Sequence, residues 1–142
     1  MVKCPRTRPS QRPTEPGPAG PLRIRADGRL VVVQAIDCQP GAALLRRQAR
    51  TLADDRRVWA AVVARAYALY RASWYPDAEE VAEGAVAATS TKALRARLTL
   101  RRLVLFGDGA WEMYLADGGL FAGHTVAVTV RAGVVEAVRL SG

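Results

Sequence analysis

The spacing of apolar residues changes twice along this chain, and these changes restrict the fold more than any other feature. In the segment LRIRADGRLVVVQAID, alternate apolar side chains would share one face, as they do on strands: Leu22, Ile24, Val31 and Val33. From Ala42 to about residue 98, apolar residues recur every three or four positions, which is the helical period. After residue 99 the strand-like pattern returns. The sequence therefore predicts an α+β fold with a helical middle between two groups of strands.

The turn residues indicate how these strands connect. Asp27-Gly28 lies between two apolar runs and predicts an N-terminal β-hairpin, because a type I′ turn needs positive φ at both central residues. Further Asp-Gly and Gly-rich turns separate the runs LTLRRLVLF, WEMYLA, LFAGHTVAVTV and VVEAVRL. Strands of this length joined by short loops are typical of antiparallel sheets. We therefore expect a C-terminal four-stranded antiparallel meander.

Capping residues indicate where the helices of the middle segment begin. We expect a helix from Ala42 to about Ala53, a second one ending near Trp74, and two short ones after it. The second helix has an aromatic stripe at helical spacing, which is more typical of a helix docked on a core than of a cofactor site. Trp59 and Trp74 are accordingly predicted to be core residues. The expected capping residues are Asp54 or Asp55, Asp77, and Ser90 or Thr91.

The N-terminal segment differs from the rest of the chain. Residues 1–21 contain six prolines and almost no large apolar side chains, so we predict a disordered tail followed by a single domain over residues 22–142. Cys4 and Cys38 have no metal or redox spacing and are expected to be free thiols. No apolar run is long enough to span a membrane, and the N-terminus has no apolar signal region. A cytoplasmic protein is the expectation.

The net charge of +8 makes nucleic acid a possible partner. Residues 1–29 hold 7 basic and 2 acidic residues, or +5, which leaves +3 for the other 113 residues. No patch interleaves basic and aromatic residues as single-strand binders do. Specific nucleic-acid binding is therefore disfavoured, and only an electrostatic association through the Arg-rich tail is kept as a third hypothesis.

The only histidine, His124, decides whether a catalytic interpretation is possible. Closing the turns at Asp108-Gly109 and Gly118-Gly119 would pair Phe106 with Trp111 and Met113 with His124. Asp117 would then lie close enough to hold one ring nitrogen of His124. The predicted core face would carry Val104, Phe106, Trp111, Met113, Leu115, His124, Val126, Val128 and Val130.

Asp117 and His124 are the only catalytic candidates, and they are weak ones. A general base needs a reacting group within hydrogen-bond reach, and a metal site usually needs three or more ligands. The chain has no second histidine, no nucleophile motif, no phosphate loop and no dinucleotide glycine pattern. We therefore expect no metal and no cofactor.

The opposite face of the predicted sheet raises the question of what covers it. Either the N-terminal hairpin or a second helix packs there, or the face contacts a protein partner or a second copy of the chain, because large apolar patches seldom stay bare. Tyr114 and Phe121 are the candidate contact residues. The predicted members of this face are Leu103, Leu105, Tyr114, Phe121, Thr125, Ala127 and Thr129, with Arg101 and Glu112 nearby.

The run FGDGAWEMYLADGGLFAGHTVAVTV resembles the bacterial domain of unknown function family 2262. That family has an Asp-Gly-x-hydrophobic-Phe-x-Gly-His signature, and an upstream helix like LADDRRVWAAVVARAYALYRASW ends in tryptophan. The resemblance covers roughly residues 28–142, and Gly119 and Ala122 depart from the pattern. It implies a fold and domain boundaries but no activity. The matching residues are Asp117, Gly118, Leu120, Phe121, Gly123 and His124.

Taken together, these patterns favour a non-enzymatic protein-binding module, for which a toxin-neutralising or adaptor protein is the fold-level analogy. The alternative is a small hydrolase-like or ligand-binding domain that uses Asp117 and His124 in a pocket near the turn. A pocket holding both side chains would favour the enzyme, whereas an uncovered patch that includes Tyr114 and Phe121 would favour the binding module.

Overall fold

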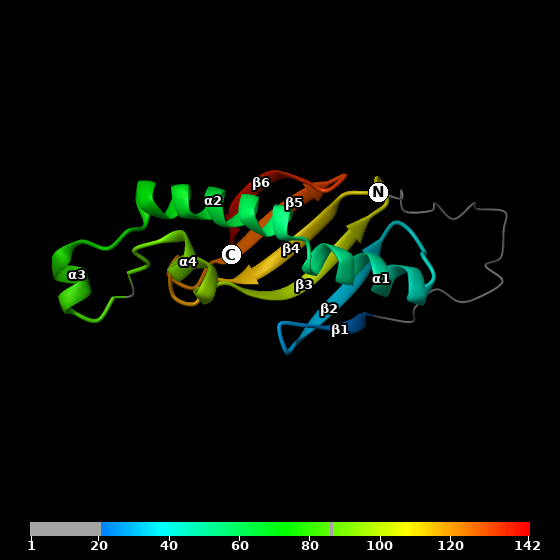
Figure 1. Ribbon diagram of the computed structural model, residues 1–142, viewed down its shortest axis with the longest axis horizontal. Coiled ribbons are helices and arrows are strands. Elements are labelled where there is room, and N and C mark those ends of the chain that lie inside the picture. The colour runs from blue at the N-terminus through cyan, green and yellow to red at the C-terminus, as the bar shows by residue number, and fades with distance from the viewer. Residues whose placement is uncertain (1–20, 86) are drawn as a thin grey trace.

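Six strands form one sheet in which strands that are consecutive in the sequence are neighbours in space. The computed structural model describes residues 21–85 and 87–142 (Figure 1). Mixed helix and sheet content confirms the predicted α+β class. The strands are β1 (Leu22–Ala26), β2 (Arg29–Ile36), β3 (Thr99–Phe106), β4 (Trp111–Ala116), β5 (Thr125–Arg131) and β6 (Val134–Ser141).

The N-terminal hairpin is confirmed. β1 and β2 are antiparallel, Ile24 lies opposite Val31, and the turn residues Asp27 and Gly28 have φ values of 51° and 73°. These are the positive φ values that a type I′ turn needs.

The predicted four-stranded C-terminal sheet was incomplete. Strands β3 to β6 do run antiparallel in order, but β2 pairs with β3 in parallel, with Val33 opposite Leu103, so the hairpin extends the same sheet to six strands. Parallel neighbours need a long crossover, usually helical. The helical middle of this chain is that crossover.

The helices begin close to the predicted residues. The Asp55 carboxylate accepts hydrogen bonds from the N–H groups of Arg57 and Val58, and the Ser90 hydroxyl accepts one from Ala93. Asp77 forms a capping box with Glu80. The helices are α1 (Ala42–Ala53), α2 (Arg56–Ser73), α3 (Ala78–Ala82) and α4 (Thr91–Arg97).

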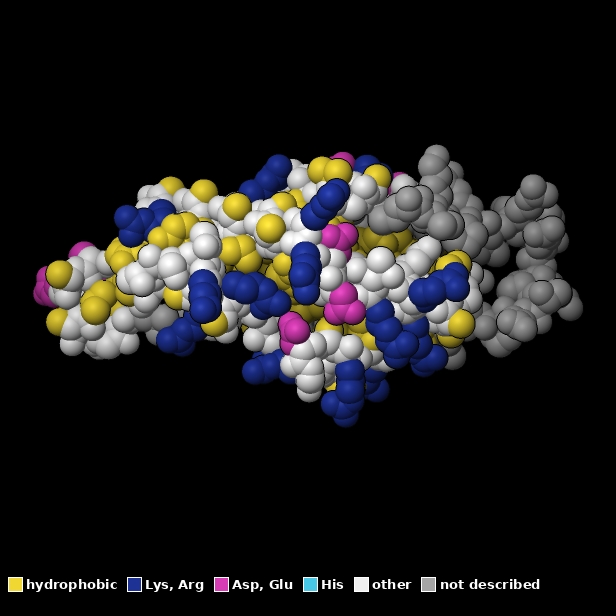
Figure 2. Space-filling model, viewed as in Figure 1, with side chains coloured by type: hydrophobic (Ala, Val, Ile, Leu, Met, Phe, Trp, Pro, Cys, Tyr) yellow, Lys and Arg dark blue, Asp and Glu magenta, His cyan; other side chains and the backbone are white. Residues whose placement is uncertain are grey.

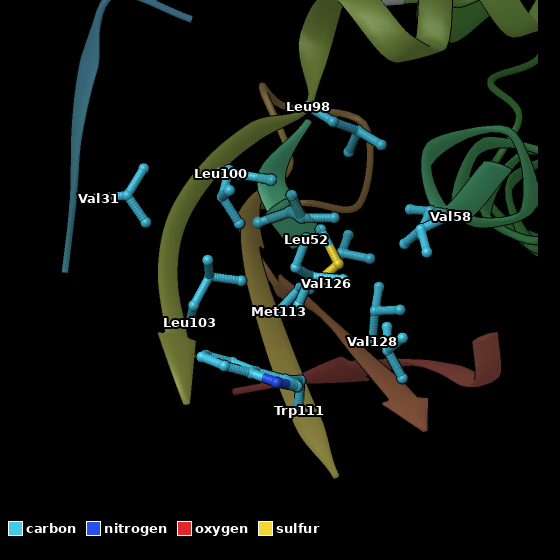
Figure 3. Packing of buried hydrophobic residues seen from close by; sticks show 14 of the residues in the cluster. Val31, Leu52, Val58, Leu98, Leu100, Leu103, Trp111, Met113, Val126 and Val128 are labelled. Carbon is cyan, nitrogen blue, oxygen red and sulfur yellow. The ribbon is translucent and has the colours of Figure 1, made fainter. Parts of the chain in front are cut away.

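The core lies between one face of the sheet and helices α1 and α2, which lie across it (Figure 1). Figure 3 shows Leu52 and Val58 from these helices pointing towards Met113 and its neighbours on the sheet. Trp59 and Trp74, both predicted to be core residues, are only half-buried at its margin. The sheet residues in the core include Val31, Val33, Leu103, Leu105, Trp111, Met113, Leu115, Val126, Val128 and Val130.

The predicted pairing of β3 with β4 was wrong by one residue. Leu105, not Phe106, lies opposite Trp111, because a three-residue loop, residues 107–109, connects the strands and Gly109 has a φ of 89°. The Asp108 carboxylate accepts a hydrogen bond from the Ala110 N–H and holds this loop. A shift of one residue exchanges the faces of a strand. Val104 and Phe106, predicted for the core face, therefore lie on the opposite face, and Leu103 and Leu105 take their place.

Three further expectations concern the ends and environment of the chain. Cys38 is disulfide-bonded, so the prediction of a free thiol there was wrong, and Cys4 lies outside the described residues. The predicted disordered tail, residues 1–21, lies outside the described residues apart from Pro21. Within the part of the chain that the structure describes, no helix has both the length and the apolar character needed to cross a membrane.

Candidate functional site

Residues 117–124 form a loop organised by a single carboxylate, not the short turn predicted at Gly118-Gly119. Asp117 is only 6 % exposed, and one of its oxygens accepts a hydrogen bond from the Gly119 N–H at 3.1 Å. The other oxygen accepts two, from the N–H groups of Phe121 and Gly123, both at 2.8 Å. Burial by itself would raise the pKa of Asp117, but these backbone donors together lower it below the ordinary value. Asp117 is thus a charged anchor for the loop.

His124 follows this loop and does not pair with Asp117. Its ring is half-buried and lies edge-on to the Trp74 ring, with a centroid distance of 5.5 Å and an interplanar angle of 72°. Among residues 21–85 and 87–142, no hydrogen bond joins the His124 ring to the Asp117 carboxylate. The predicted pairing of these two side chains was therefore wrong. The predicted pairing of His124 with Met113 was also wrong, because β5 begins only at Thr125 and Met113 lies opposite Val128.

Phe121 was predicted to lie on the outer face of the sheet, and this was wrong. Its side chain is fully buried, with the rings of Tyr70 and Trp74 at 5.8 Å and 5.9 Å. The cause is the loop: β5 begins only at Thr125, so Phe121 is not a strand residue and its face cannot be derived from alternation. A buried ring cannot contact a partner.

A groove of about 300 Å³ lies between α1 and the turn that joins β5 to β6. Its polar lining includes Arg47, Gln48 and Asp55, and Trp111 also lines it. The Asp55 carboxylate already accepts the hydrogen bonds that cap α2. Neither Asp117 nor His124 lines the groove. Within the described ranges, no three His, Cys, Asp or Glu side chains are grouped so that they could hold a metal ion.

The second face of the sheet carries no described helix (Figure 1). We call it the helix-free face. Strand register places one row of side chains across all six strands of this face: Arg23, Val32, Arg102, Tyr114, Ala127 and Arg139. All three arginines of this row are exposed, whereas Val32 and Tyr114 are half-buried.

Polar contacts fix the centre of this row. The Arg102 guanidinium lies over the Tyr114 ring, 4.6 Å from its centroid. The Tyr114 hydroxyl donates a hydrogen bond to Glu112, whose other oxygen accepts one from Arg139. Burial, together with the hydrogen bond to Glu112, raises the pKa of Tyr114, so its hydroxyl remains a donor well into alkaline pH. The centre of the helix-free face is therefore an ordered network.

Apolar side chains flank this row on β2. Leu30 and Ile36 alternate with the core residues Val31 and Val33, so they share the helix-free face, and they are 55 % and 43 % exposed. Arg25, opposite Leu30 on β1, is exposed on the same face. The face thus combines exposed apolar, aromatic and basic groups.

Tyr114 was identified correctly as a residue of the outer face, but the arginine row was not. The charges were assessed along the sequence, whereas the row forms only across strands. Alternation of Arg23 and Arg25 with Leu22 and Ile24 was a visible signal, because it places both arginines opposite the core. The positions of Arg102 and Arg139 depend on strand registers, and these registers depend on the lengths of the glycine-rich loops, which the sequence does not fix.

The chain matches no protein-family model, and comparisons with curated proteins and with solved structures return no match.

Proposed function

We propose that this protein is a non-enzymatic protein-binding module and that its contact surface is the helix-free face of the sheet. The supporting observation is the combination, on a face that no described helix covers, of Tyr114, ordered arginines and the exposed side chains of Leu30 and Ile36. Tyrosine and arginine are enriched at the energetic centres of protein interfaces. A toxin-neutralising protein is one kind of module that this proposal includes.

The hydrolase alternative has less support. A general base needs a free acceptor beside a reacting group, but both oxygens of Asp117 are occupied by backbone N–H groups of its own loop. The His124 ring contacts Trp74. These contacts account for both side chains without a substrate.

Two sequence-based expectations are not used in this proposal. The resemblance to the bacterial domain of unknown function family 2262 stays a prediction. The cytoplasmic location also stays a prediction, and the disulfide at Cys38 does not favour it, because reducing compartments rarely keep disulfides.

Site-specific photo-cross-linking tests the proposal. In one variant, a photoreactive phenylalanine analogue replaces Gln34, which lies on the helix-free side of β2. In a second variant of the same chain, it replaces Arg65, which is exposed on α2. In extracts of the source cells, position 34 should give discrete protein adducts and position 65 should not. Equal labelling at both positions, or no protein adduct at position 34, would contradict the proposal.

The captured protein is then purified and its affinity measured directly. Arg102→Ala should weaken binding by about tenfold or more, because removal of a central interface arginine typically costs that much. Arg65→Ala, which removes an exposed arginine from the helical side, is the matched control and should leave the affinity within about twofold. If both variants weaken binding equally, the contact surface is not the helix-free face.

A further inference from the structure

Resting on the proposed function, we infer that the partner is acidic: the arginine row receives the carboxylates of an extended acidic polypeptide segment. Every charged side chain in the row is an arginine: Arg23, Arg102 and Arg139. Glu112 lies in the adjacent row, opposite Val104, and its charge is already compensated by Arg139. Arg23 and Arg102 therefore present positive charge that no acidic side chain among the described residues compensates.

The spacing of the arginines defines the length of the segment that would fit. Neighbouring strands are about 4.8 Å apart, so Arg23 and Arg102 lie about 10 Å apart along the row and Arg102 and Arg139 about 14 Å apart. The whole row thus extends about 24 Å, which an extended chain covers with about seven residues. A single acidic side chain would leave most of the row unused, whereas an acidic segment would cover it.

The chemistry of the row also favours carboxylates. A guanidinium offers a planar pair of N–H donors that matches the two oxygens of a carboxylate. The Tyr114 ring holds the Arg102 guanidinium, while Arg139 is held by Glu112 and by a hydrogen bond to the Thr129 hydroxyl at 3.4 Å. Held side chains lose less conformational freedom on binding than free ones. Within the described residues, Arg23 and Arg25 form no ion pair with an acidic side chain, so both are available to a partner.

Two other occupants fit less well. A second copy of the chain, facing the first, would oppose arginine to arginine, and such like-charge contacts cost several kcal/mol. Single-stranded nucleic acid binds open sheets by stacking bases on exposed aromatic rings, but Arg102 lies over the Tyr114 ring and Glu112 holds its hydroxyl. On the side that α1 and α2 cover, basic side chains lie among hydrophobic and acidic ones (Figure 2).

Binding of labelled model polymers to the full chain tests the inference by fluorescence anisotropy. The probes are an alternating Glu-Gly peptide of about 20 residues, the matched Gln-Gly peptide, and oligothymidine of similar length. The Glu-Gly peptide should bind more tightly than the other two, and added salt should weaken its binding. Tighter binding of oligothymidine that also depends on the row would overturn the inference in favour of nucleic acid.

Matched variants locate the binding. Arg23→Gln combined with Arg25→Gln leaves the Glu112 network intact and should weaken Glu-Gly binding by about tenfold. Arg46→Gln combined with Arg65→Gln removes the same charge from exposed positions on α1 and α2 and should change the affinity by less than about twofold. If both double variants weakened Glu-Gly binding equally, the peptide would be attracted to the net positive charge of the whole protein. The inference that the arginine row binds it would then be refuted.

A third variant separates geometry from charge. Arg102→Lys keeps the positive charge but removes the planar fork, so Glu-Gly binding should weaken, whereas a purely electrostatic surface would bind unchanged. Thermal unfolding of each variant confirms that it is folded. If the Glu-Gly peptide fails to bind while the cross-linked protein still depends on Arg102, the acidic partner is refuted and the proposed function stands.

Discussion

At the residue scale, the Asp117 carboxylate organises a loop where the sequence had predicted a short turn. A buried carboxylate is costly unless it is compensated, and here three backbone N–H groups compensate it. The same three bonds bring Phe121 into the core and leave His124 at its margin beside Trp74. The Asp-Gly signature that suggested a catalytic pair is explained by this loop.

Asp117→Asn should therefore destabilise the protein at neutral pH, by about 2–3 kcal/mol, because the amide has one acceptor oxygen and no charge. The pKa of Asp117 is lower in the folded protein than its ordinary value of 3.8. Its contribution is therefore complete above that value and is lost as the pH falls through the lowered pKa. Urea unfolding at a series of pH values should show the difference from wild type narrowing below about pH 4. The exposed Asp54→Asn is the control, and a constant difference down to the lowest pH would contradict this account.

At the scale of elements, the helix starts were predictable, whereas among the strand registers only that of the N-terminal hairpin was. Helix starts depend on local chemistry that the sequence displays, as in the Asp55 cap and the Asp77–Glu80 capping box. Strand register depends on loop length, and a loop that contains Asp-Gly can close with two residues or with three. The loop at residues 107–109 has three residues. Leu103 and Leu105 therefore lie on the core face, where Val104 and Phe106 had been predicted. Pairing of β2 with β3 joins segments that α1 to α4 separate, and no local signal specifies it.

The loop at residues 117–124 also depends on close packing at Gly118. A Cβ at Gly118 would lie 2.5 Å from the Arg97 carbonyl oxygen, and the residue has a φ of +59°. Gly123, at +84°, also has a positive φ, but a Cβ there would meet nothing within 4 Å. Gly123→Ala should therefore cost about 1 kcal/mol for backbone strain alone, and Gly118→Ala about 1–3 kcal/mol more. Equal unfolding free energies for the two variants would show that the contact with Arg97 has no energetic role.

At the scale of the whole molecule, the two faces of the sheet differ in what covers them. Helices α1 and α2 bury one face, whereas the other presents the arginine row and depends on no described helix. The sequence placed Tyr114 on this face but left open what covers it, and it did not indicate which arginines would join it. That information resides in the registers of strands separated by up to 116 positions, the distance from Arg23 to Arg139. A function carried by such a row leaves no contiguous motif.

Two adjacent residues on β3 test this difference between the core face and the helix-free face directly. Leu103 is fully buried on the core face, and Arg102 is exposed on the helix-free face. Leu103→Ala should cost about 2–5 kcal/mol in unfolding free energy, because it removes core packing and leaves a cavity. Arg102→Ala should cost less than about 1 kcal/mol, because it removes one exposed side chain and its contact with the Tyr114 ring. Urea unfolding of both variants measures the difference. If Arg102→Ala destabilised the fold as strongly as Leu103→Ala, the row would be part of the folded packing and not a surface kept available for a partner.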